Sequence, residues 1–97
     1  MAYDPQIVLG IVKARLNRLA SDITLDAYLT QRIEAANVKL RRTGITLIEN
    51  DPEDQLFLAD YVAWEYGNRD KPGSMPEWLR LARRERFLRN GVTPDDS

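Results

Sequence analysis

The sequence contains no cysteine and no histidine. Without cysteine, neither a disulfide nor a thiolate metal site can reinforce the fold. Because both residue types are absent, zinc sites of the usual ligand types and the Ser–His and Cys–His nucleophile pairs are excluded as well. The five glycines are scattered along the chain, so no glycine-rich phosphate loop is present. We therefore expect no metal site, no cofactor and no catalytic residues.

Long hydrophobic runs are also missing. No stretch approaches the roughly 18–20 consecutive apolar residues that a membrane span needs. The first residues lack the basic start and the apolar run of a signal peptide, and 97 residues suggest one domain with a limited core. We expect a soluble, intracellular protein with a single helical domain over residues 1–91 and a flexible acidic C-terminal tail over residues 92–97.

Four segments carry helix-start signals. Asp4 precedes Pro5 and Asp51 precedes Pro52, and this pairing of a capping acid with a proline is typical of a helix N-terminus. Thr24 begins a further periodic segment, and residues 74–77 have the Ser-x-x-Glu pattern of a capping box. The first helix is expected to continue to Leu19. The sequence thus predicts four helices.

Apolar residues recur at helical spacing in each segment, and the third segment is apolar on most faces, which predicts a central helix. Residues 45–49 are β-prone but short and have no evident partner, so they form either an extended loop or a strand that pairs with a neighbouring subunit. The predicted fold is all-α, a small four-helix bundle-like domain with a short extended connector between its second and third helices. Its predicted core contains Leu29, Ile33, Phe57, Tyr61, Trp64 and Trp78.

The net charge is −1, which provides no global attraction to nucleic acid. Residues 80–89 nevertheless contain five arginines and one acid, Glu85. These arginines form a solvated helix face, a subunit interface or a set of phosphate contacts. The candidate interface residues in this segment are Arg80, Arg83, Arg84 and Arg89.

Clustered carboxylates offer one further kind of chemistry. Asp51, Glu53 and Asp54 lie close together in sequence. A carboxylate pair performs acid–base catalysis only in a cleft that separates the two pKa values. Helix capping and the helix dipole already explain these acids, so we do not expect an enzyme.

The order of these features resembles the head–tail connector (adaptor, or head completion) proteins of long-tailed phages and prophages. An early helix has an acid followed by spaced apolar residues (residues 26–36), and a later helix ends in Trp-x-Tyr-x-Asn-Arg-Asp (residues 64–70). A final helix opens with proline at residues 75–79. The resemblance covers residues 22–90, although the first helix is longer and more apolar than is typical of the family.

The resemblance implies a structural virion protein that performs no reaction. Connector subunits form a ring, commonly a dodecamer, beneath the portal protein and join the capsid to the tail. They also contact a head-closure or tail protein, and DNA passes through their channel without sequence-specific binding. Assembly would occur in the host bacterial cytoplasm. By this resemblance, Arg69 and Asp70 fix a turn or a subunit contact, and the fourth helix and the tail meet the portal or a neighbour. The alternative is a small helical nucleic-acid-binding or regulatory protein that uses its arginine-rich C-terminal helix.

Overall fold

The structure, a computed structural model, describes residues 3–19, 21–68 and 74–91, without the side chains of residues 90 and 91. The chain forms α1 (Pro5–Arg15), α2 (Asp26–Arg42), α3 (Pro52–Gly67) and α4 (Glu77–Gly91). Within the described ranges there is no β-strand. The predicted all-α, four-helix domain is confirmed.

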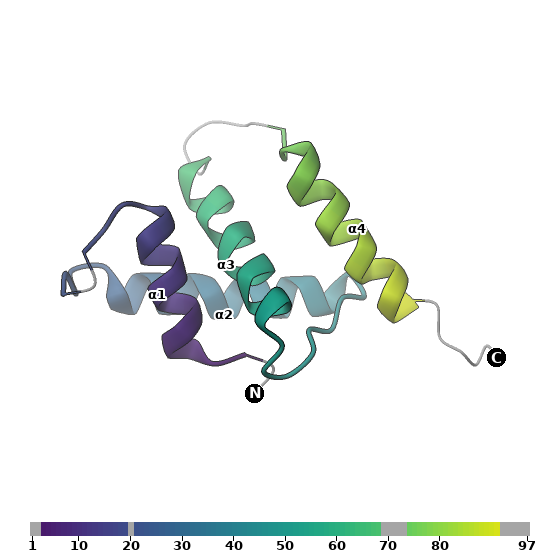
Figure 1. Ribbon diagram of the computed structural model, residues 1–97, viewed down its shortest axis with the longest axis horizontal. Coiled ribbons are helices and arrows are strands. Elements are labelled where there is room, and N and C mark those ends of the chain that lie inside the picture. The colour runs from purple at the N-terminus through teal and green to yellow at the C-terminus, as the bar shows by residue number, and fades with distance from the viewer. Residues whose placement is uncertain (1–2, 20, 69–73, 92–97) are drawn as a thin grey trace.

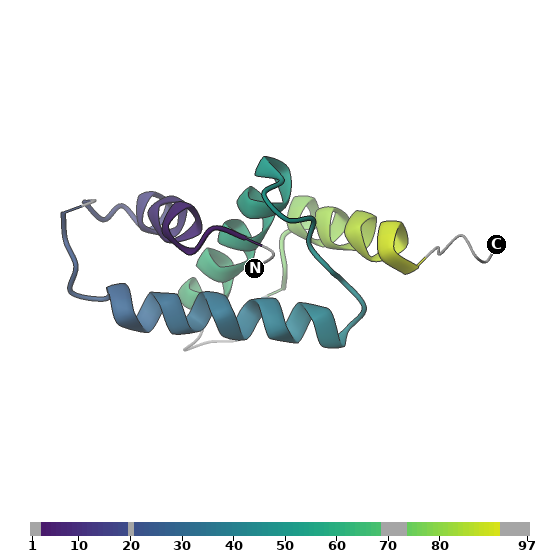
Figure 2. The same ribbon diagram turned by 90° about the horizontal axis from the view of Figure 1, so that it is seen from below.

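Three helices form a layer, and α2 crosses this layer. α1, α3 and α4 lie side by side with α3 in the middle, and α2 runs across one face of this layer (Figures 1 and 2). α3 contacts each of the other helices, whereas α4 packs against no other helix than α3. The prediction of a central third helix is therefore confirmed, and α4 is a peripheral helix with much of its surface uncovered.

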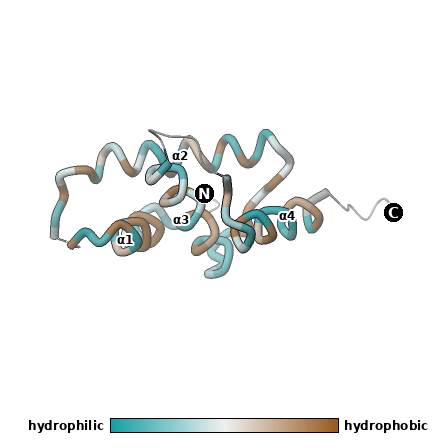
Figure 3. Tube along the Cα trace, turned by 90° about the horizontal axis from the view of Figure 1, so that it is seen from above, coloured by the Kyte–Doolittle hydropathy of each residue, from teal (hydrophilic) through white to brown (hydrophobic). Residues whose placement is uncertain are grey.

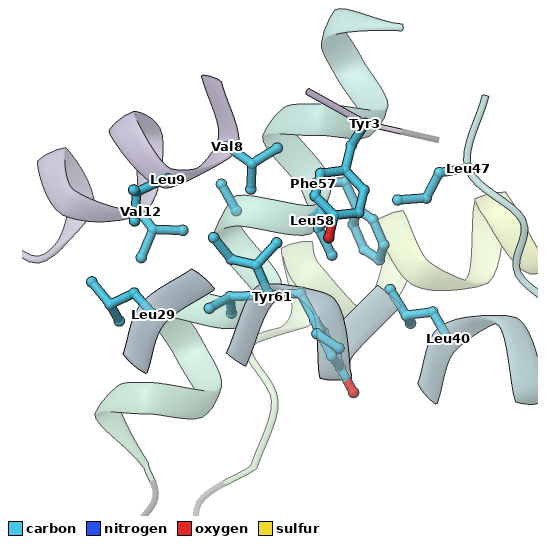
Figure 4. Packing of buried hydrophobic residues seen from close by; sticks show 14 of the residues in the cluster. Tyr3, Val8, Leu9, Val12, Leu29, Leu40, Leu47, Phe57, Leu58 and Tyr61 are labelled. Atoms are coloured by element: carbon cyan, nitrogen blue, oxygen red, sulfur yellow. The ribbon is translucent and has the colours of Figure 1, made fainter. Parts of the chain in front are cut away.

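The hydrophobic core lies between α3 and the two helices α1 and α2 (Figure 4). Four of the six predicted core residues are buried, namely Leu29, Ile33, Phe57 and Tyr61. Trp64 is half-buried and packs against the core. Trp78 is 51% exposed, so its prediction as a core residue is wrong. The neighbouring Leu79 is buried instead. Because successive residues of a helix point about 100° apart, Trp78 and Leu79 cannot both face the core.

Two helix starts follow the prediction. The Asp4 carboxylate accepts hydrogen bonds from the amides of Gln6 and Ile7 at the start of α1. The Asp51 carboxylate accepts one from the amide of Asp54, at 2.9 Å, at the start of α3. Both acids satisfy amides that a helix N-terminus leaves without partners.

The other two helices begin later than predicted. α2 starts at Asp26 without a side-chain cap, because Thr24 lies in a preceding turn and its amide donates to Asp22. α4 starts at Glu77, where the carbonyl of Pro76 accepts from the amides of residues 79 and 80. Glu77 is therefore the first residue of the helix, and the predicted capping box with Ser74 does not form.

The first helix is shorter than predicted. α1 ends at Arg15, and Asn17 has a positive φ of 61°, which stops the helical path. Leu19 lies beyond the end of α1 and is 74% exposed, so the expectation that it continues the helix is wrong. Asn tolerates the left-handed conformation better than most residues, which explains a stop at this position.

Residues 45–48 form an extended loop between α2 and α3, as one of the two predictions had it. Gly44 has a φ of 96°, and the amide of Ile45 donates to the carbonyl of Leu40, which closes the C-terminus of α2. Ile45 and Leu47 are buried, whereas Ile48 is half-exposed. The alternate side chains of Ile45 and Leu47 thus hold this connector against the core, although it forms no strand with the described residues.

Candidate functional site

α4 is attached to the rest of the molecule through a buried carboxylate on α3. Asp54 is fully buried, and its two oxygens accept from Arg86 Nε at 2.8 Å and Arg89 Nη2 at 2.9 Å. The amide of Ile48 donates to the same carboxylate at 2.7 Å. Asp54 thus joins α3, α4 and the connector.

Arg86 is the most deeply placed arginine of α4, with 8% of its surface exposed. Its Nη1 and Nη2 atoms donate to the backbone carbonyls of Ala82 and Glu53, and its guanidinium lies 4.7 Å from the centre of the Phe57 ring. Sequence reasoning did not select Arg86. Its spacing of seven residues from the apolar Leu79 was the available signal, because this spacing places both residues on one helix face.

Arg89 was predicted as an interface residue, but it uses its donors within the chain. Nη1 and Nη2 donate to Asp54, and Nη2 also donates to the carbonyl of Thr46 at 3.3 Å. About a third of the side chain remains exposed. Any contact of Arg89 with a partner stays a prediction, and its observed contacts are structural.

The pKa of Asp54 is set by two opposing effects. Burial raises the pKa of the Asp54 carboxyl, but the hydrogen bonds from Arg89, from the amide of Ile48 and from Arg86 outweigh burial, so that the pKa is lowered. The hydrogen bond to Asp54 likewise raises the pKa of Arg89. The carboxylate therefore stays charged at neutral pH and holds α4 in place.

One side of α4 carries a basic hollow that we call the arginine flank. Arg80, Arg83 and Arg84 are exposed and surround a hollow of about 380 Å³. Its apolar part comes from Ile45 of the connector and Phe87, which is 47% exposed, and Thr43 completes the lining. The structure thus brings together three of the predicted interface arginines and separates them from Arg89.

The opposite side of α4 carries acids and exposed apolar side chains, which we call the acidic flank. It consists of Glu53, Leu56, Asp60, Trp78 and Glu85. The first four of these line a hollow of about 190 Å³ between α3 and α4, together with Phe57, Ala82 and the buried Arg86. Glu85 lies seven residues after Trp78 and hence on the same helix face. Leu56 is 49% exposed and Trp78 51%. Sequence reasoning missed this flank because Trp78 is apolar and was predicted as a core residue.

Two acids of this flank already have basic neighbours. Glu85 Oε1 lies 4.0 Å from Nη1 of Arg86. Asp60 lies 3.2 Å from Nε of Arg15 on α1, and the same guanidinium lies 5.7 Å from the centre of the Trp78 ring. Burial raises the pKa of Asp60, and the charge of Arg15 lowers it by less. Glu53 and Glu85 are exposed, so most of the accessible negative charge of the flank comes from these two residues.

The outer edge of α4, between the two flanks, is apolar in part. Leu81 is 48% exposed and Leu88 45%. Hydrophobic and hydrophilic residues alternate along this helix (Figure 3). A helix with apolar side chains both on its packed face and on its outer edge is typical of a contact surface for another protein.

The remaining predictions concern residues outside the described part of the chain or other kinds of chemistry. Arg69, Asp70 and the tail at 92–97 lie outside the described residues. Among the described residues, no group of three acids is placed to hold a metal ion. No helix that the structure describes has the length and the apolar composition to cross a membrane.

Comparisons with known proteins identify no family. No family model matches the chain, no curated protein matches it, and no solved structure matches it.

Proposed function

We propose that this protein is a non-enzymatic structural subunit of a phage or prophage particle, a head–tail connector that forms a ring beneath the portal and joins capsid to tail. The proposal combines the resemblance of residues 22–90 to that family with the exposed surface of α4. The observation that carries it is the set of apolar side chains that the chain itself leaves uncovered on α4: Trp78, Leu81, Phe87 and Leu88.

An assembly role accounts for the way in which α4 is held. The Asp54 ion pairs fix this helix on α3, and among the helices that the structure describes only α3 packs against it. Rigid attachment lowers the entropic cost of ordering a surface when a partner binds. An uncovered, rigid helix with exposed leucine, tryptophan and arginine has the composition that protein interfaces favour.

In this role the partners are other copies of the chain, the portal protein, and a head-closure or tail protein. DNA passes through the ring without sequence-specific contact, and the assembled protein resides in the virion. The small net charge of −1 agrees with DNA that passes and does not bind tightly.

The test is the mass of the protein by light scattering, with and without its cognate portal protein. We expect a ring-sized mass or a stoichiometric complex with portal. A variant with Leu81→Ser and Leu88→Ser should lose the complex with portal, whereas the control Ile7→Ser, at a similarly exposed apolar residue of α1, should keep it. A wild-type protein that ignores portal would contradict the proposal.

The arginine flank favours a second candidate, a small helical nucleic-acid-binding or regulatory protein. Three exposed arginines on one side of α4 could contact phosphates. This function predicts DNA binding by the monomer, with a slope of log K against log salt of about −0.9 for each phosphate neutralised. Light scattering with DNA in place of portal, repeated over a series of salt concentrations, distinguishes the two functions.

A further inference from the structure

The two flanks of α4 carry opposite charge and similar apolar character. On the arginine flank, Arg80, Arg83 and Arg84 surround Ile45 and Phe87. On the acidic flank, Glu53 and Asp60 lie beside Leu56 and Trp78, and Glu85 adds a further charge. Arg86 in this hollow is buried, and Arg15 pairs with Asp60, so Glu53 and Glu85 supply the exposed negative charge. Arg80, Arg83 and Arg84 lie on one side of α4 by helical spacing, and Trp78, Ala82 and Arg86 lie on the other, so one helix presents both hollows.

We propose that copies of this chain associate head to tail, with the arginine flank of one copy docked on the acidic flank of the next. This inference rests on the proposed function, because it specifies how subunits of the assembly meet. The occupant of the arginine flank is therefore a second copy of the chain, presented through Glu53, Glu85, Leu56 and Trp78.

Charge decides against a two-fold contact centred on either flank. With the two-fold axis through the arginine flank, that flank meets its own copy, so three arginines would face three arginines. Like charges brought together at an interface repel and disfavour that pairing. A contact between unlike flanks instead pairs guanidinium groups with carboxylates and also removes Phe87, Leu56 and Trp78 from water.

The position of the flanks decides what kind of assembly results. Because a head-to-tail contact uses two different surfaces, an open assembly leaves an arginine flank free at one end and an acidic flank free at the other. Such a contact continues until the rotation between copies closes a ring, or it grows into an open filament. The contact between flanks thus generates an assembly of many subunits and does not stop at a dimer.

Charge reversal tests the proposal on the whole chain. The variant Arg83→Glu with Arg84→Glu makes both flanks acidic, and the variant Glu53→Lys with Glu85→Lys makes both flanks basic. We expect each variant alone to be monomeric by light scattering. An equimolar mixture should recover association, because every flank then has a complementary neighbour. High salt should weaken association of the wild-type chain and of the mixture alike.

Matched controls separate this contact from general effects of charge or folding. Arg32→Glu, on α2, and Glu49→Lys, in the connector, reverse single charges outside both flanks and should leave association unchanged. Circular dichroism and thermal unfolding should show that every variant is folded. None of the substituted side chains is a partner of Asp54. Glu85 lies 4.0 Å from Arg86, so thermal unfolding of the variant Glu53→Lys with Glu85→Lys checks that the anchor of α4 remains.

Three outcomes would overturn the proposal: a wild-type chain that stays monomeric up to its solubility limit, a reversal variant that still associates alone, or a mixture that stays monomeric. Its failure is distinguishable from failure of the proposed function. A chain that binds portal while the mixture stays monomeric would keep the connector function and reject the flank contact. A mixture that associates while the wild type does not bind portal would keep the flank contact and reject the connector function.

Discussion

The Asp54 carboxylate on α3 and the Arg86 guanidinium on α4 form a buried ion pair, with 2.8 Å between Oδ1 and Nε. The Asp54 side chain is 1% exposed and that of Arg86 10%. The pair lies where α4 meets α3, the only helix among those described that it packs against. The attachment of the proposed assembly helix therefore depends on a charge that water does not reach.

Replacement of Asp54 by alanine should destabilise the protein strongly. The substitution leaves Arg86 buried without its partner and removes an acceptor from the amide of Ile48. Removal of one partner of a buried ion pair costs about 3–5 kcal/mol. Urea denaturation followed by circular dichroism measures this change. The exposed acid Glu49 supplies the control, since Glu49→Ala should change stability by at most about 0.5 kcal/mol. Equal effects of the two substitutions would contradict the assigned role.

The contribution of Asp54 to stability should disappear in acid. Its pKa is lowered in the folded chain, so the folded state binds fewer protons than the unfolded state and stability rises with pH. The contribution is fully present above the unfolded pKa of about 3.9 and is lost as pH falls through the lower folded pKa. We expect the difference in unfolding free energy between wild type and Asp54→Asn to shrink below about pH 4. A difference that is independent of pH down to the acid transition would show that the charge of Asp54 is not what matters.

Alanine at two glycines should have effects of opposite sign. Gly44 has a φ of 96°, and a Cβ atom there would lie 3.2 Å from the Phe87 ring. A left-handed conformation costs a non-glycine residue about 1–2 kcal/mol, so Gly44→Ala should lower stability by at least this amount. Gly10 lies inside α1 with no atom near its missing Cβ, so Gly10→Ala should raise stability by up to about 1 kcal/mol. Thermal unfolding of both variants beside the wild type measures both signs.

The two tryptophans should differ in their access to a neutral quencher. Trp78 is 51% exposed, whereas Trp64 is half-buried against the core. Acrylamide should therefore quench the variant Trp64→Phe, which retains Trp78, more strongly than the variant Trp78→Phe. A neutral quencher is required because the guanidinium of Arg15 near the Trp78 ring would attract an anionic one. Equal quenching of the monomeric variants would contradict the exposure of Trp78. In assemblies formed through the flanks, Trp78 should become protected.

Local signals in the sequence were sufficient for the helices and two of their starts. Asp4 and Asp51 cap α1 and α3 because a short carboxylate next to a proline satisfies free amides whatever the rest of the chain does. The apolar spacing of Leu29 and Ile33 likewise identified the buried face of α2. Gly44 marked the end of that helix because few other residues adopt its positive φ without strain.

Only the tertiary structure decided which side of α4 faces inward. Trp78 and Leu79 are both apolar, and packing against α3 buries Leu79 and leaves Trp78 on the acidic flank. The arginines likewise share one chemistry in the sequence, yet Arg86 pairs with a carboxylate 32 residues away while Arg83 faces the solvent. Helical periodicity places residues on faces, but it does not say which distant carboxylate meets a given face. The pairing of an arginine with a distant carboxylate depends on long-range contacts. These contacts separate Arg86 and Arg89, which hold the fold, from the exposed arginines of the arginine flank.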